Sequence, residues 1–226
     1  MQLVRMVKGL LPISLRKMIR GIIKKIRYRF RLYKIKSAIR ESNGLKIIVG
    51  AAETHQKGWF STNEQWLDIT KEIDWIRLFR GKTILTHVVA EHVFEHLTPN
   101  EIHEALCNIC RHLNDGGQIR IAVPDGYHPS GEYIEHVKVG GKGDDAADHK
   151  QLLNQDSLKK YLKEAGLNGF EVVQGYDKDG FLTSNSWRSE NGYIRRSRQN
   201  GDSVDWGFPD ASTSLIVDAW KQCADQ

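Results

Sequence analysis

The chain has 226 residues, of which 40% are hydrophobic and 27% are charged, which is typical of a globular domain and excludes a disordered or fibrous chain. Three cysteines offer no disulfide framework, and this favours a cytoplasmic location. The net charge of +5 is unevenly distributed, because residues 1–40 hold 13 Lys or Arg and no Asp or Glu. We therefore predict a basic arm over residues 1–40 and an acidic domain over residues 41–226.

The arm is predicted to form an amphipathic helix that begins after Ser14. Apolar residues recur at steps of three and four from Leu15 to Tyr33, while Lys and Arg fill the other positions. Such a helix lies in a membrane interface, so we expect residues 14–40 to bind an anionic membrane surface on its cytoplasmic side. No apolar run reaches the length of about 20 residues that a spanning helix needs.

Three other interpretations of the arm stay open. Its apolar stripe could pack on the domain or on a second subunit. A basic helix also neutralises phosphates, although we disfavour nucleic acid as the partner. Arg without acidic residues also fits a mitochondrial presequence.

In the domain, apolar β-branched runs alternate with helical patterns. The expected strands lie within residues 45–53, 82–92, 116–126, 169–176 and 212–220, and the expected helices within residues 71–79, 98–113 and 154–167. A capping box from Thr98 to Glu101 opens the second helix, and the glycines at 116 and 117 are expected to stop it. This alternation predicts a Rossmann-like α/β fold, a compact and mostly parallel sheet covered on both faces. The run at 212–220 could be an edge strand open to pairing, and the oligomeric state stays open.

Three polar clusters follow three of these strands. They read "GAAE" from Gly50, "AEH" from Ala90 and "PDG" from Pro124. Because ligands of open α/β sheets bind beyond the carboxyl ends of the strands, we expect the clusters to share one rim.

The segment "HVFEH", residues 92–96, has the H-x-x-E-H pattern of inverted zinc peptidases. Thr98 and Pro99 start a new helix only two residues later, so His92 and His96 are expected on a strand-end loop and not on a long helix. Other acids and histidines could serve a metal, namely Asp125, His128, His136, Asp148 and His149. We assign no metal ligand, and a metal-dependent hydrolase using His92 and His96 is kept as a second alternative.

The pattern as a whole resembles a known family. The matching text is "GWFSTNEQWLDIT", "AEHVFEHLTPNE", "GGQIRIAVPDGYHPSGEYIEHV", "DHKQLLNQDSLKKYLKEAGL", "NGYIRRS" and "SLIVDAW". Over residues 45–221 the chain is similar to class I S-adenosylmethionine-dependent methyltransferases, and to small predicted members often associated with cell-surface polysaccharide synthesis. The resemblance implies S-adenosyl-L-methionine as the cofactor. It also implies a saccharide, or a lipid-linked or nucleotide-linked sugar, as the acceptor. That this transfer takes place at the cytoplasmic membrane surface is a separate expectation, which rests on the basic arm outside the matching residues.

The resemblance also implies a cofactor site. Gly50, Ala51 and Ala52 match the turn beside the methionine part of the cofactor, where small residues allow close approach. Asn63 stands where the family has an acid that binds the ribose. Asp68 and Ile69 match the position that borders the adenine, although Asp68 could instead cap a helix near Thr70. Glu91 and His92 match the loop beside the sulfonium and the acceptor.

The catalytic candidates are residues that could accept a proton from a hydroxyl acceptor. They are His92, Asp125, His128 and His149. Glu95 and His96 are expected to brace the loop, and Asp125 could be a plain turn residue. The glycine-rich segment "VGGKGDD", residues 139–145, could be a lid or a disordered connector.

Two departures from the family pattern support another alternative. The turn "GAAETHQ" lacks a G-x-G, and residues 50–59 are too few to hold a crossover helix, which would leave the cofactor pocket open on that side. A methyltransferase-like binding module without catalysis is therefore the first alternative.

Overall fold

The computed structural model describes residues 13–41, 44–52, 54–143, 145–186, 188–195 and 214–222. It divides into two units, Met1–Ser42 and Asn43–Gln226. The described part of the first unit is a single helix, α2 (Ile13–Glu41), with no acidic residue in its first turn and Arg40 in its last. Among the described residues, no helix has both the length and the apolar character needed to span a bilayer.

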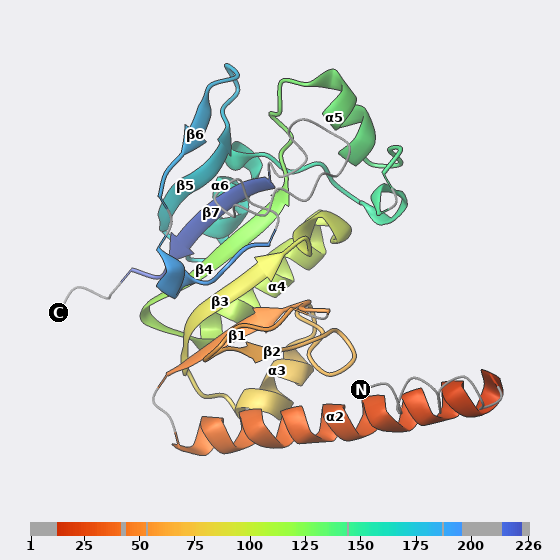
Figure 1. The fold of residues 1–226 in the computed structure, drawn as a ribbon. Coiled ribbons are helices and arrows are strands. Elements are labelled where there is room, and N and C mark those ends of the chain that lie inside the picture. The colour runs from red at the N-terminus through yellow and green to blue at the C-terminus, as the bar shows by residue number, and fades with distance from the viewer. Residues whose placement is uncertain are drawn as a thin grey trace. The chain divides into compact units, whose positions relative to one another are not determined.

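The second unit is built on a seven-stranded sheet with the order β2-β1-β3-β4-β7-β5-β6 (Figure 1). The strands are β1 (Leu45–Val49), β2 (Phe60–Ser61), β3 (Leu85–Glu91), β4 (Leu113–Pro124), β5 (Gly169–Tyr176), β6 (Leu182–Ser184) and β7 (Ser214–Trp220). The pairs β2–β1, β1–β3 and β3–β4 are parallel, whereas β7 runs antiparallel to both β4 and β5. The predicted α/β Rossmann-like fold with a parallel core is confirmed.

Helices cover one face of this sheet (Figure 1). They are α3 (Glu72–Phe79), α4 (Pro99–His112) and α6 (Gln155–Glu164), while α5 (Gly131–Val137) stands beyond the end of β4. α4 begins with the predicted capping box, in which Thr98 and Glu101 each accept a hydrogen bond from the backbone N–H of the other. Trp75 of α3 packs against His112 of α4, so the two helices share one core.

The opposite face is covered differently from our expectation. In the described part of the domain no α-helix lies there, and loop residues fill the space instead. Ile194 and the partly buried Trp59 pack on the strand residues Ile48, Val89 and Ile216. Alternate residues of each strand point to this face, so Ile48 of β1, Val89 of β3 and Ile216 of β7 are buried there without a helix.

A buried ion pair within the sheet binds the loop segment that covers this face. Arg120 of β4 lies opposite Asp218 of β7, and its Nε and Nη2 each donate to the carboxylate at 2.7 Å. Nη1 of Arg120 also donates to the carbonyl of Gly192 at 2.6 Å, and Asn191 donates to Asp218 at 3.0 Å. The segment around η3 (Ser189–Asn191) is therefore held through a bidentate charged hydrogen-bonded pair.

Two sequence predictions were wrong. β7 is not an edge strand, because it lies between β4 and β5. The glycines at 116 and 117 do not stop α4, since the chain is already extended at Leu113, where β4 begins. The prediction that residues 50–59 hold no helix is confirmed for the described residues of that segment.

Candidate functional site

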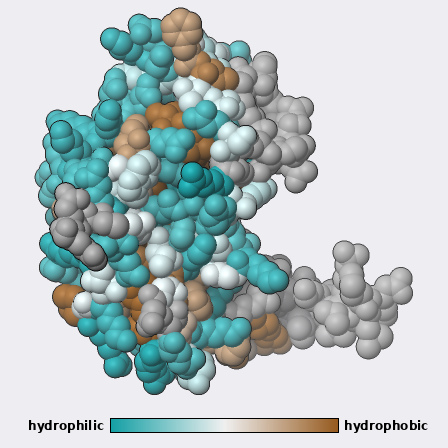
Figure 2. Space-filling model, turned by 90° about the vertical axis from the view of Figure 1, so that its left-hand side faces the viewer, coloured by the Kyte–Doolittle hydropathy of each residue, from teal (hydrophilic) through white to brown (hydrophobic). Residues whose placement is uncertain are grey.

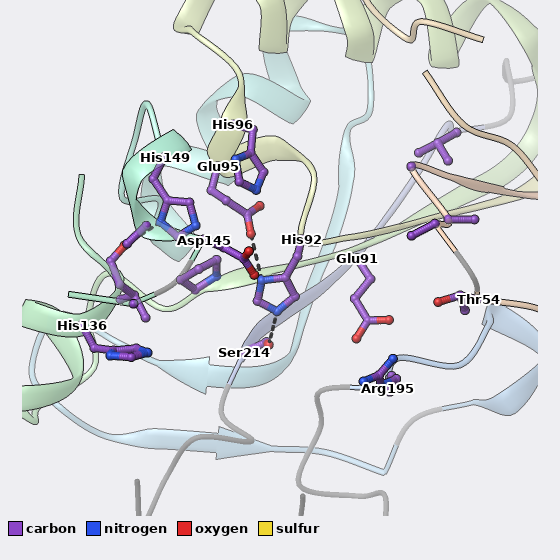
Figure 3. A pocket seen from close by; sticks show the side chains of 18 of the residues that line it. Thr54, Glu91, His92, Glu95, His96, His136, Asp145, His149, Arg195 and Ser214 are labelled. Atoms are coloured by element: carbon purple, nitrogen blue, oxygen red, sulfur yellow. Dashed lines mark hydrogen bonds and ion pairs between the residues drawn. The ribbon is translucent and has the colours of Figure 1, made fainter. Parts of the chain in front are cut away.

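A cavity of about 540 Å³ opens at the carboxyl ends of β1, β3 and β4 (Figure 3). The chain runs from β1 outward to β2 and then returns to β3 on the other side of β1, so the strand order reverses here. At such a point the loops after neighbouring strands diverge and leave a crevice. Gly50, Glu91 and Pro124 all line the cavity, which confirms that the three strand-end clusters share one rim.

The turn after β1 depends on a glycine at position 50. Gly50 has a φ of +58°, and a Cβ there would lie 2.5 Å from Cγ2 of Val93. The loops after β1 and β3 therefore touch at this point, which only a residue without a side chain permits. Ala51 and Ala52 line the same wall, and Ala52 also has a positive φ of 45°. This small-residue wall leaves room for a ligand to approach the backbone.

His92 lies at the centre of the cavity wall. It has a φ of +53°, which is uncommon for a residue with a side chain and indicates a functional constraint. Its Nδ1 lies 2.8 Å from Oε1 of Glu95, and its Nε2 lies 3.0 Å from the hydroxyl of Ser214 (Figure 3). The three side chains come from the loop after β3 and from the start of β7, and they form a continuous hydrogen-bonded chain.

The ionisation of Glu95 determines which ring nitrogen of His92 carries the proton. Burial raises its pKa, but the hydrogen bond from His92, and the charge that His92 carries when it is protonated, oppose that effect, and the pKa of Glu95 lies below its usual value. An ionised carboxylate only accepts hydrogen bonds, so Nδ1 of His92 carries the proton. In the neutral ring, Nε2 then accepts from the hydroxyl of Ser214 and is the basic atom of the pair.

The insertion between β4 and α6 forms another wall. Its residues Gly143, Asp145 and Ala146 line the cavity, together with Tyr133 and His136 of α5. The glycine-rich loop packs tightly on α5, because a Cβ on Gly141 would meet the carbonyl of His136 at 2.7 Å. In its described residues this loop is an ordered wall of the cavity.

The segment 188–195 brings Arg195 to the cavity. Gln56 exchanges two hydrogen bonds with the backbone of Tyr193, at 2.7 and 3.0 Å, and so ties this segment to the turn after β1. Arg195 lines the cavity near Glu91 and Thr54 (Figure 3). Arg195 was not predicted as a site residue, although it lies within the matching text "NGYIRRS".

Ser214 was also not selected from the sequence. It is the first residue of β7, and its place beside His92 follows from the insertion of β7 next to β4. Because β7 runs antiparallel to β4, its first residue lies beside the last residue of β4. Ser214 could therefore have been predicted as a site residue only if the order of the strands in the sheet had been known.

The predicted cofactor residues divide into two groups. Gly50, Ala51, Ala52, Glu91 and His92 line the cavity. The residues predicted for the ribose and the adenine, which follow β2, lie outside the cavity wall; they are Asn63, Asp68 and Ile69. The residues present therefore fit the methionine end of S-adenosylmethionine.

Asp68 makes local contacts in the turn before α3, although the N-cap of the helix itself is Lys71, without a side-chain cap. Its Oδ1 accepts hydrogen bonds from the backbone N–H and the hydroxyl of Thr70, at 3.1 and 2.7 Å, and its Oδ2 lies 2.8 Å from Nζ of Lys71. Partial burial raises the pKa of Asp68, but the bonds from Lys71 and Thr70 lower it more. The carboxylate thus caps the turn that precedes α3. The carbonyl of Ile69 accepts from Trp75 and Asn108 inside the core.

Of the four predicted proton acceptors, two line the cavity and two lie outside its wall. His92 and His149 line the cavity, whereas Asp125 and His128 do not. Asp125 is fully buried and accepts from the backbone N–H groups of Tyr127 and Tyr176, at 3.0 and 2.7 Å. His128 stacks on Tyr133 with ring centroids 4.0 Å apart. The contacts of Asp125 and His128 are those of residues that shape the turn after β4.

The pairing of His92 with His96 that a zinc hydrolase needs is not present. Residues Phe94–His96 form a single 3₁₀ turn, η1, and not a helix of several turns. Both ring nitrogens of His92 are engaged by Glu95 and Ser214. The alternative of a hydrolase using His92 and His96 therefore has no support.

Comparison with solved structures found distant resemblances. A methyltransferase from Archaeoglobus fulgidus that depends on S-adenosylmethionine is 16% identical, with a TM-score of 0.48 and coverage of 88% of this chain and 94% of that chain. Another from Thermotoga maritima is 14% identical, with a TM-score of 0.45 and coverage of 90% and 97%. A third, from Methanosarcina mazei, is 12% identical, with a TM-score of 0.43 and coverage of 81% and 94%.

Comparison with curated proteins found no match. A family model described as "Methyltransferase domain" matches residues 33–172, which is more than half of the chain.

Proposed function

The chain belongs to this methyltransferase domain family and is a class I enzyme that uses S-adenosylmethionine, and from that premise we propose that its acceptor is a saccharide hydroxyl. The acceptor would be a free, lipid-linked or nucleotide-linked sugar of the kind used in cell-surface polysaccharide synthesis. The observation that carries the proposal is the polar lining of the cavity beside the turn after β1. Its hydrogen-bonding side chains are those of Thr54, Glu91, His92, Glu95, His96, Tyr133, His136, Asp145, His149, Arg195 and Ser214.

So many polar groups suit an acceptor that has several hydroxyls. A buried donor or acceptor left without a partner costs about 1–3 kcal/mol, so an apolar acceptor would bind poorly here. A site built to bind hydroxyl groups also rejects analogues that lack them.

S-adenosylmethionine supplies an activated methyl group, so the protein must bind the acceptor, exclude water and take up one proton. Gly50, Ala51 and Ala52 would hold the methionine end of the donor. An acceptor hydroxyl that donates to Oγ of Ser214 would pass on its proton, since Ser214 can donate its own to Nε2 of His92. The buried Glu95 stabilises the imidazolium that forms. Base catalysis of this kind contributes about 10²–10⁴-fold to a rate.

Transfer of a radiolabelled methyl group to a panel of acceptors tests this proposal. We expect labelling of sugars or sugar nucleotides, and none of their deoxy analogues that lack the methylated hydroxyl. Labelling confined to amines, carbon acids or catechols would contradict a saccharide acceptor and leave the enzyme class unchanged. Absence of any transfer at saturating donor would favour the alternative of a binding module.

We also propose that α2 binds an anionic membrane surface and so brings the enzyme to lipid-linked acceptors on the cytoplasmic side. Its apolar residues Met18, Ile19, Ile22, Ile23, Ile26, Phe30 and Tyr33 are exposed, and the sequence of the helix holds no acidic residue before Glu41. The side of the domain seen in Figure 2 is mainly hydrophilic, with small separate apolar patches. Apolar residues among many cations on one helix are typical of interfacial helices.

Flotation with liposomes should show this binding. We expect the protein to float with vesicles that contain anionic lipid and to stay behind with zwitterionic ones. Replacing Ile22 and Ile26 with glutamate should abolish flotation, because two charged side chains interrupt the apolar stripe and also reduce the net positive charge of the helix. The matched control places glutamate at Phe181 and Leu182, which are exposed on the β5–β6 hairpin, and it should float like the native protein. Unchanged flotation of the Ile22 and Ile26 variant would refute the role of α2.

A further inference from the structure

Three side chains at one end of the cavity could bind one metal ion. Glu95, His96 and His149 each offer a ligand atom, and these atoms all lie within 4.8 Å of one another. All three residues line the cavity (Figure 3), and the rings of His96 and His149 meet edge to face with centroids 5.0 Å apart. Two imidazoles and one carboxylate are a ligand set of catalytic zinc sites and of other first-row transition metal sites.

The carboxylate of Glu95 has one oxygen that lacks a partner. Oε1 accepts from His92, but Oε2 is buried and accepts no hydrogen bond from any residue that the structure describes. The Glu95 side chain is only 1% exposed, so solvent does not compensate this oxygen. A buried acceptor without a partner is costly and rare, and a bound cation would satisfy it.

In both histidines the ring nitrogen Nδ1 faces a backbone carbonyl. Nδ1 of His149 lies 2.7 Å from the carbonyl of Val137, and Nδ1 of His96 lies 3.2 Å from the carbonyl of Asp148. A carbonyl only accepts, so Nδ1 carries the proton in each ring, and Nε2 keeps its lone pair. Metal-binding histidines are commonly held by such a second hydrogen bond to a carbonyl.

The backbone builds this cluster from distant parts of the chain. The N–H groups of Lys150 and Gln151 both donate to the carbonyl of Glu95, at 2.8 and 3.2 Å. The side chain of Gln151 also donates to the carbonyl of Leu97 at 2.8 Å. These bonds fix the segment that carries His149 against the turn that carries Glu95 and His96, so the cluster is a built part of the fold.

We propose that Glu95, His96 and His149 bind a divalent first-row transition metal ion such as Zn²⁺, through Oε2 and the two Nε2 atoms. Three protein ligands leave coordination positions open toward the cavity for an oxygen ligand. If the proposed function holds, that ligand is the acceptor hydroxyl, whose proton a metal ion makes easier to remove. His92 then has a second task, because its hydrogen bond orients the carboxylate that holds the ion.

Metal binding can be measured without donor or acceptor, so failure of the methyl transfer assay would not affect the result. The full chain is purified without a histidine tag, stripped with a chelator and titrated with ZnCl₂ by calorimetry. We expect one ion per chain and a rise in melting temperature, because the ion binds the folded state. Titration with CoCl₂ should give visible absorption bands of a low-coordinate site.

Variants identify the ligands. Glu95→Gln, which keeps the shape of the side chain, and His149→Ala should each weaken Zn²⁺ binding by more than about 100-fold, the upper end of the loss seen for outer-shell partners. The matched control is His103→Ala with Cys107→Ala. His103 is exposed and Cys107 is half-buried on α4, and the sulfur and ring nitrogens lie 3.7–3.8 Å apart, so this pair could bind zinc adventitiously. The control variant should bind as the native protein does.

Three results would overturn the proposal. They are no stoichiometric ion, binding that survives Glu95→Gln and His149→Ala, or binding that is lost in the control. Melting of the stripped variants shows whether they are folded. In a folded Glu95→Gln variant, loss of the zinc-induced rise in melting temperature supports the site.

Discussion

Replacing His92 with alanine is expected to lower kcat for methyl transfer by about 10²–10⁴-fold, the range for loss of a general base. The dissociation constant of S-adenosylhomocysteine should change little, because the turn from Gly50 to Ala52 stays intact. Parallel measurement of single-turnover rates and of binding by calorimetry separates these two effects.

Two further variants sharpen this result. Ser214→Ala should reduce the rate less than His92→Ala does, since an acceptor hydroxyl can then reach Nε2 of His92 directly. His103→Ala removes an exposed histidine on α4 and should leave the rate unchanged. A His92→Ala enzyme within about fivefold of the native kcat would show that another group takes the proton.

Asp218→Ala is expected to lower the free energy of unfolding by about 3–5 kcal/mol, because it leaves the charge of Arg120 buried without its partner. Arg120 is 1% exposed, so water cannot replace the carboxylate. Urea denaturation of the native protein and the variant measures the difference.

Removing both partners should cost much less than removing one. Arg120→Met combined with Asp218→Leu leaves no stranded charge, and such replacements are often neutral or stabilising. Glu72→Ala is the matched control, since it breaks the exposed Arg111–Glu72 pair, which is worth about 0–1 kcal/mol. A cost below about 1 kcal/mol for Asp218→Ala would mean that Arg120 finds another partner or solvent.

The elements of the domain could be predicted because their signals are local. Alternating apolar runs located five of the seven strands, and the capping box located the start of α4. The carboxyl ends of parallel strands meet at one edge of a sheet, so the polar clusters that follow the strands could be predicted to lie together. On that basis alone, Gly50, Glu91 and His92 were correctly placed at one site.

The rest depends on contacts between distant segments. The place of β7 could not be read from its own residues, because an apolar run looks the same at an edge and in the middle of a sheet. Ser214 and the Arg120–Asp218 pair were therefore missed. Asn63, Asp68 and Ile69 were assigned by resemblance alone, and their role in cofactor binding stays a prediction.

The central position of β7 has a consequence for how the domain assembles. β4 and β5 are made earlier in the chain, yet neither pairs with the other, since β7 lies between them. Until residues 214–220 leave the ribosome, both strands present an unpaired edge, which invites pairing with another chain. The sheet should therefore close only after the last strand is synthesised, and nascent chains that stop before Ser214 should depend on chaperones to stay free of aggregates.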